Sequence, residues 1–81
     1  HLDDTTKKAT KALVEILSSE NEPDDLQNSI YQIAKNNSVQ PKDFFKVLYQ
    51  IILASDRGPK IGPFIIDIGR KKVAQVLSEY L

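Results

Sequence analysis

The sequence contains no cysteine, no methionine and no tryptophan, and its single histidine is the first residue. Without cysteine, a disulfide framework and a thiolate metal site are both excluded. A lone terminal histidine excludes histidine-based metal sites and histidine-based catalysis. No apolar run approaches the roughly 20 residues that a membrane-spanning helix needs. We therefore expect a chain without a metal, without a cofactor and without a membrane segment, whose role is not catalytic.

The length of 81 residues suits one small hydrophobic core, so we expect a single domain over residues 1–81, with residues 1–4 disordered. Because the sequence opens on His1 and lacks methionine, we expect it to be excised from a larger protein. Its 11 lysines and arginines balance 11 aspartates and glutamates, which argues against a general polyanion binder. The charge is uneven, since residues 56–81 carry five basic side chains and three acidic ones.

A repeated Gly-Pro pair, Gly58-Pro59 and Gly62-Pro63, separates two apolar segments. Each proline fixes its own φ, removes a backbone donor and pushes the preceding residue out of the helical region. The pattern predicts a stiff, ordered connection that presents Arg57 and Lys60 to solvent. A helix is expected to follow, with Pro63 at its first position and Gly62 as its cap.

Apolar residues recur with helical period in most of the chain, and no segment alternates long enough to form a strand. The pattern predicts an all-α fold, a small helical bundle of four longer helices plus one short helical turn. The first helix is expected to begin at Thr5 or Thr6 and to end near residues 18–21. The second is expected to begin at Pro23, with Asp24 and Asp25 in its first turn.

The third helix begins at Pro41 and carries the most apolar stripe in the chain, so we expect it to be the central helix. Phe44, Leu48 and Ile52 are its expected core residues. The short turn covers residues 63–68, and a last helix begins at Arg70. Its buried face is expected to comprise Val73, Val76, Leu77, Tyr80 and Leu81.

Basic side chains after residue 56 are the candidates for a binding role. Arg57 and Lys60 could contact phosphates or base edges of a nucleic acid, with a solvated linker as the alternative. Arg70 and Lys71 begin a helix, where the helix dipole disfavours cations. Cations at this end lower the stability of the helix, which suggests an anionic partner. The simpler interpretation is that both side chains are only solvated.

Two aromatic side chains, Phe64 and Tyr49, are candidate platforms on which unpaired bases stack. Burial in the core is the alternative for both. Asp24 and Asp25 do not form a catalytic carboxylate pair, because adjacent residues of a helix point about 100° apart.

A resemblance to the C-terminal end of class I lysyl-tRNA synthetases is carried by residues 57–65, Arg-Gly-Pro-Lys-Ile-Gly-Pro-Phe-Ile, and 68–73, Ile-Gly-Arg-Lys-Lys-Val. Residues 31–35 and 41–49 resemble the two helices that precede this end in the family. The resemblance covers roughly residues 23–81. The first helix carries no motif of the family.

This resemblance implies an α-helical anticodon-binding domain of a cytoplasmic enzyme that joins lysine to its tRNA using ATP. The family's catalytic motifs, His-x-Gly-His and a Lys-Met-Ser-Lys-Ser-like loop, cannot be present in a chain with one histidine and no methionine. The fragment, expected to be monomeric, would then bind the anticodon loop of lysine tRNA. One continuous surface is expected to hold Arg57, Lys60, Arg70 and Lys71, with Tyr49 and Phe64 available for base stacking.

Two alternatives stay open at this point. Class I glutamyl-tRNA synthetases end in a related pattern, a proline-rich turn followed by a glycine and a basic helix. A helical protein-interaction module is the other alternative, in which the apolar face of the third helix meets a partner helix. Salt dependence separates RNA binding from an apolar groove, because only RNA binding weakens steeply as salt is added.

Overall fold

A computed structural model describes residues 3–19 and 24–81 of the chain. The described residues form five helices and no strand: α1 (Asp4–Ser18), α2 (Leu26–Asn36), α3 (Pro41–Leu53), α4 (Ile61–Ile68) and α5 (Arg70–Ser78). The predicted all-α class is confirmed. The expected short helical turn is α4, which forms a complete helix of 8 residues.

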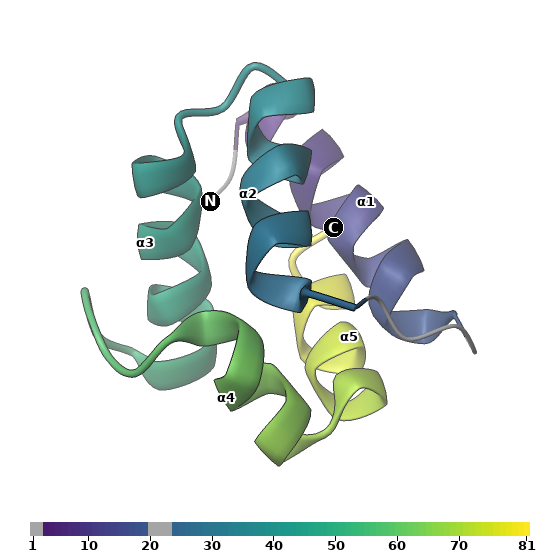
Figure 1. Ribbon diagram of the computed structural model, residues 1–81. Coiled ribbons are helices and arrows are strands. Elements are labelled where there is room, and N and C mark those ends of the chain that lie inside the picture. The colour runs from purple at the N-terminus through teal and green to yellow at the C-terminus, as the bar shows by residue number, and fades with distance from the viewer. Residues whose placement is uncertain (1–2, 20–23) are drawn as a thin grey trace.

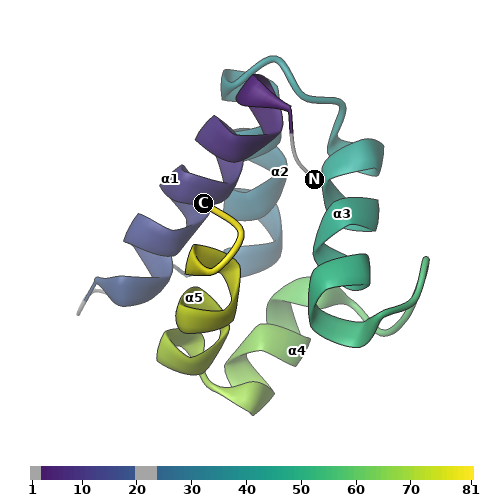
Figure 2. The same ribbon diagram turned by 180° about the vertical axis from the view of Figure 1, so that it is seen from behind.

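The helices α3, α2 and α1 stand side by side, and α4 and α5 close the bundle at one end (Figure 1). Seen from behind, α5 lies against α1, and this is the most extensive helix pair in the fold (Figure 2). The α4 helix crosses the ends of α2 and α3. The first and last helices of the described chain therefore share one side of the core.

The expectation that α3 is the central helix is wrong. It lies at the edge of the bundle, across α2 from α1 (Figure 1), and only Phe44 and Leu48 on it are fully buried. Ile52, an expected core residue, is half-buried. Because α1 packs mainly on α5, the apolar stripe of α3 packs against fewer residues of the other helices than its apolar composition led us to expect.

Asp3 is the N-cap of α1. Its carboxylate accepts the backbone N–H of Thr6 at 2.8 Å and the hydroxyl of Thr5 at 3.1 Å. Hydrogen bonds from Thr6, and then from Thr5, hold the pKa of Asp3 below its ordinary value. The helix accordingly starts at Asp4, before the predicted Thr5 or Thr6. Asp3 and Asp4, which we expected to be disordered, form its cap and its first residue, and residues 1–2 lie outside the described chain.

Helix α2 also begins with an aspartate cap. The carboxylate of Asp25 accepts the backbone N–H of Asn28 at 3.1 Å, and Leu26 is the first helical residue. Asp24 and Asp25 therefore precede the helix, and their predicted place in its first turn is wrong. Aspartate is among the strongest N-cap residues, because its side chain satisfies a backbone donor that the helix leaves unpaired. Pro23, the predicted start, lies outside the described residues.

Helix α4 begins at Ile61, two residues before the predicted start at Pro63. Pro63 is tolerated at the third position because the first N–H groups of a helix have no partner inside it. Gly62 is not the cap but a buried contact with α2: its N–H donates to Oε1 of Gln27 at 2.7 Å. An added Cβ would lie only 2.7 Å from the Gln27 backbone nitrogen.

The C-terminal end of α5 differs from the predicted stripe. Val73 and Leu77 are buried as expected, and Ala74 is buried beside them. Tyr80 and Leu81 are 47% and 48% exposed, so their predicted burial is wrong. The reason is that α5 ends at Ser78, so residues 79–81 lie beyond the helix.

Candidate nucleic-acid interface

The loop between α3 and α4, residues 54–60, carries Arg57 and Lys60, and we call it the Gly-Pro loop. All its residues are exposed. It is held to α3 at two points: Tyr49 donates its hydroxyl to the Pro59 carbonyl at 2.6 Å, and Gln50 donates its amide to Asp56 at 2.9 Å. Both basic side chains therefore project from a loop whose backbone is fixed on a helix.

The Tyr49 hydroxyl is expected to determine the order of this loop. Tyr49→Phe removes one hydrogen bond, so the free energy of unfolding should fall by ~0.5–1.5 kcal/mol. Backbone order parameters at residues 57–60, measured by NMR relaxation, should move toward the flexible range below about 0.6. Tyr31→Phe is the matched control, because Tyr31 lies on α2, away from the loop. Unchanged order parameters in the Tyr49 variant would mean that the prolines alone hold the loop.

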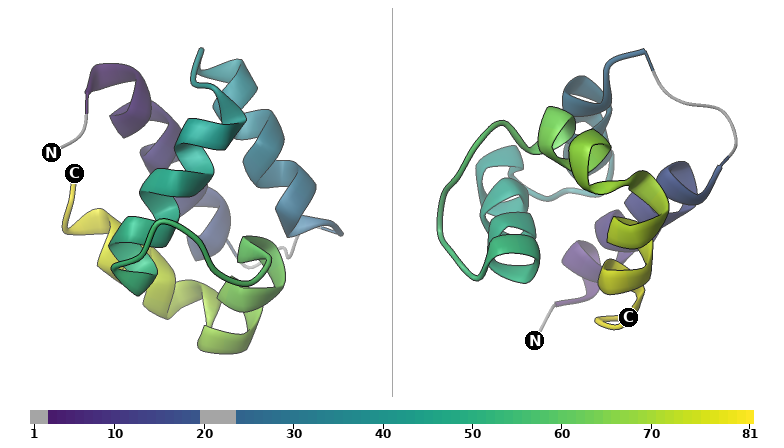
Figure 3. Two further views of the ribbon diagram at one scale, coloured as in Figure 1. Left: turned by 90° about the vertical axis from the view of Figure 1, so that its left-hand side faces the viewer. Right: turned by 90° about the horizontal axis from the view of Figure 1, so that it is seen from below.

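Arg70 and Lys71 lie beyond the other end of α4. Because α4 has 8 residues, its ends are about 12 Å apart, and the Gly-Pro loop and the start of α5 lie on opposite sides of the bundle end (Figure 3). The structure thus keeps Arg57 with Lys60 on one segment and Arg70 with Lys71 on another. A single surface that holds all four stays a prediction.

Arg70 has a structural partner that sequence reasoning did not foresee. Its Nη1 atom donates to the Ser19 carbonyl, at the C-terminal end of α1, at 3.2 Å. A cation at a helix C-terminus interacts favourably with the dipole, which offsets the unfavourable place of Arg70 at the start of α5. For Arg70, the unfavourable interaction with the α5 dipole, which suggested an anionic partner, is therefore offset inside the domain. Lys71 is exposed.

The two candidate stacking residues are both half-buried. Phe64 packs against the hydrophobic core. The Tyr49 ring lies beneath the loop, since a Cβ added at Gly58 would lie 3.5 Å from two of its ring carbons. Core packing therefore accounts for much of the surface of each ring, and the remainder of Tyr49 opens into a groove.

This groove is lined by residues of α2, α3 and the Gly-Pro loop, and we call it the α2–α3 groove. Its volume is about 500 Å³, and its walls are Gln27, Lys42, Phe45, Lys46, Tyr49 and Asp56. A second hollow of about 340 Å³ adjoins it and shares Gln27 and Phe45. Two lysines beside two half-buried aromatic rings are a combination that suits single-stranded nucleic acid.

Sequence reasoning missed Lys42, Lys46 and Phe45 as candidates. A signal for them exists in the sequence. Lys42 and Lys46 are four residues apart, as are Phe45 and Tyr49, so each pair lies one turn apart on α3.

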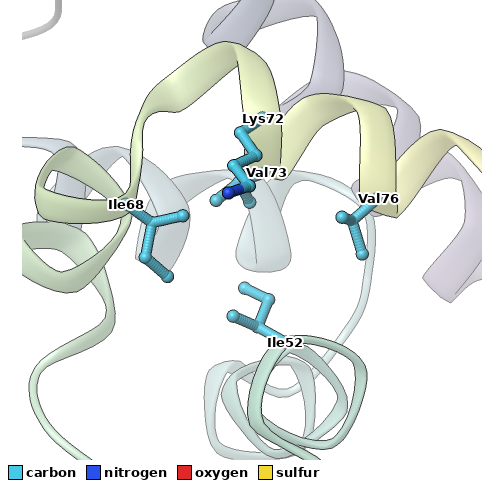
Figure 4. A pocket seen from close by; sticks show the side chains of 5 residues that line it. All are labelled: Ile52, Ile68, Lys72, Val73 and Val76. Atoms are coloured by element: carbon cyan, nitrogen blue, oxygen red, sulfur yellow. The ribbon is translucent and has the colours of Figure 1, made fainter.

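A third, smaller hollow of about 180 Å³ lies between α3 and the start of α5. Ile68 and Val76 flank it, Ile52 faces it from α3, and Lys72 runs across Val73 (Figure 4). Its lining is almost wholly apolar, which is the kind of surface that the protein-interaction alternative requires.

No set of three or more potential metal ligands clusters within residues 3–19 and 24–81. Among the same residues, none of the helices has the length and apolarity to cross a membrane.

Lysine–tRNA ligases are similar to the chain along almost its whole length. That of Cenarchaeum symbiosum (strain A) is 55% identical over 76 residues, which cover 94% of this chain and 14% of the relative. That of Borreliella burgdorferi is 35% identical over 83 residues, which cover 99% and 16%. The chain corresponds to one region of a lysyl-tRNA synthetase.

A third lysine–tRNA ligase, from Picrophilus torridus, is 34% identical over 79 residues, covering 98% of this chain and 16% of the relative. The chain thus spans about one sixth or less of the length of these synthetases. No family model matches it, and no solved structure matches it.

Proposed function

We propose that the chain is the anticodon-binding domain of a class I lysyl-tRNA synthetase and that it recognises the anticodon loop of lysine tRNA. The observation that carries the proposal is the match to lysine–tRNA ligases along 94% to 99% of this chain. The longer enzyme would attach lysine to tRNA with ATP in the cytoplasm. This region would contribute affinity and specificity, and no catalytic group.

The Gly-Pro loop supports the proposal on physical grounds. Unpaired bases of an RNA loop are read by stacking and by hydrogen bonds to their edges, while cations hold the phosphates. Arg57 offers a planar guanidinium for a base edge or a phosphate, and Lys60 offers a point charge. Both project from a backbone that Tyr49 and Gln50 hold in place, so little loop entropy is lost on binding.

The two alternatives, a glutamyl-tRNA synthetase and a helical protein-interaction module, differ in the observations that support them. The names of the relatives favour lysine over glutamate as the amino acid of the longer enzyme. The helical protein-interaction reading is favoured by one observation, the apolar hollow beside Ile52 and Val76. Binding there would be nearly independent of salt, which gives the two readings opposite expectations.

A titration of the isotope-labelled chain with a lysine anticodon stem-loop tests the proposal directly. Amide shifts should move saturably at Arg57, Gly58 and Lys60 and at residues 70–71. If two to four phosphates are neutralised, log K should fall with log[salt] with a slope of about −1.4 to −2.8. The same stem closed by an unrelated four-nucleotide loop is the control. Equal affinity for both RNAs would contradict anticodon recognition.

In the longer enzyme, Arg57→Gln and Lys71→Gln are the sharper variants, because Arg70 also bonds to Ser19. A base-reading or phosphate contact worth ~1–3 kcal/mol corresponds to a loss of about 5- to 150-fold in aminoacylation kcat/KM. Lysine activation without tRNA should be unchanged. Lys11→Gln, on α1, is the matched control. Undiminished aminoacylation in both variants would count against this surface and in favour of the partner-helix reading.

A further inference from the structure

We infer that the α2–α3 groove seats one unstacked nucleotide of the bound RNA, with its base on Phe45 and the two phosphates that flank it on Lys42 and Lys46. The inference rests on the proposed function and assigns part of it to residues that were not among the candidates taken from the sequence. The ligand class is a single-stranded ribonucleotide.

The spacing along α3 builds one wall of the groove. Lys42 and Lys46 are one helical turn apart, and both are exposed and line the same hollow. Two cations at this spacing form a short basic ridge that a nucleic-acid backbone can follow. Asp56 is the acidic residue of the lining.

The floor of the groove is aromatic. Phe45 and Tyr49 lie one turn apart on α3, and each is half-buried, so each ring is held by packing while part of it faces the hollow. Tyr49 is further fixed by its bond to Pro59. A base that stacks on a ring already held in place costs little side-chain entropy, and such stacking is sequence-tolerant.

The remaining walls carry a donor and an acceptor. Oε1 of Gln27 accepts the Gly62 N–H at 2.7 Å, so the amide NH₂ is the other polar group of this side chain. Oδ1 of Asp56 accepts from Gln50 at 2.9 Å, and the second carboxylate oxygen can accept another hydrogen bond. A donor and an acceptor in one lining can both bond to the edge of an unpaired base, which carries groups of both kinds.

The test uses the 81-residue chain with two single-stranded heptamers of the same charge, oligo-rU and an abasic ribose-phosphate strand. Oligo-rU should bind more tightly and shift the Phe45 ring signals. Lys42→Gln combined with Lys46→Gln should lower the magnitude of the salt slope by about 1.4, since two phosphate contacts are lost. Lys7→Gln combined with Lys8→Gln, on exposed sites of α1, removes the same charge and should leave the slope unchanged. Circular dichroism checks that both variants fold.

A second variant keeps the apolar packing and removes the stacking surface. Phe45→Leu should weaken oligo-rU binding about 5- to 150-fold, the range that corresponds to stacking of one base. Equal affinity for oligo-rU and the abasic strand, or equal losses in the α3 and α1 lysine variants, would overturn the inference.

The results also separate this inference from the proposed function. If the lysine anticodon stem-loop binds and depends on Arg57 while the Lys42 and Lys46 changes have no effect, the groove assignment fails and the proposed function stands. If oligo-rU binds in the groove but the stem-loop is not preferred over its control, the groove stands and anticodon recognition fails. Absence of binding to every RNA overturns both.

Discussion

Leu48→Ala is expected to lower the free energy of unfolding by about 2–5 kcal/mol. Leu48 is 0% exposed and belongs to the shared core, so truncation removes buried apolar area and leaves a cavity. This is a large fraction of the stability of so small a domain. Chemical denaturation monitored by circular dichroism measures the change, with the denaturant slope expected to stay constant.

Leu81→Ala is the matched control for this variant. The same atoms are removed, but Leu81 is 48% exposed and lies beyond the end of α5. Its effect should stay within about 0.5 kcal/mol. A comparably small effect for Leu48→Ala would show that the apolar stripe of α3 does not pack in this core.

Gly62→Ala is expected to destabilise the fold by about 1–3 kcal/mol, the usual range for overpacking. In an ordinary helix the same change stabilises by up to about 1 kcal/mol, so the sign is the test. The new Cβ would lie 2.7 Å from the backbone nitrogen and 2.9 Å from the Cα of Gln27. Backbone atoms cannot rotate away, so α4 must shift against α2. Gly62→Val should cost more, because its branches add to the same overlap.

Gly58→Ala is the control, since a Cβ there also meets an atom too closely, at 2.6 Å. That atom is Cδ1 of Leu53, the end of a flexible side chain, which can change rotamer. Its effect should remain within about 0.5 kcal/mol. Stabilisation in Gly62→Ala, measured by the same denaturation experiment, would mean that α4 docks on α2 more loosely than the bond from Gly62 to Gln27 indicates.

Local chemistry predicted much of this fold. Pro41 begins α3 and Gly69 separates α4 from α5, because each residue type restricts the backbone wherever it occurs. The start of α2 was misplaced for a local reason as well: Asp25 suits a cap and a first turn almost equally, and sequence alone does not rank them.

Features that depend on a distant segment could not be predicted in this way. Gly62 was interpreted through its neighbour Pro63, while its burial depends on Gln27, 35 residues away. Arg70 was interpreted through its own helix, while its partner Ser19 is 51 residues away. The α2–α3 groove has the same origin, because Gln27 and Asp56 join the lysines of α3 only after three segments have packed.

The pairing of α1 with α5 bears on where this domain can be cut. The residues that carry the family motifs begin near residue 23, and a boundary drawn from them would discard α1. Yet Leu13 and Leu17 of α1 are fully buried in the same core as Val73 and Leu77 of α5. A fragment that starts at residue 23 would leave α5 without α1, the helix on which it packs most extensively. The smallest autonomous folding unit therefore includes the one helix that carries no recognisable motif.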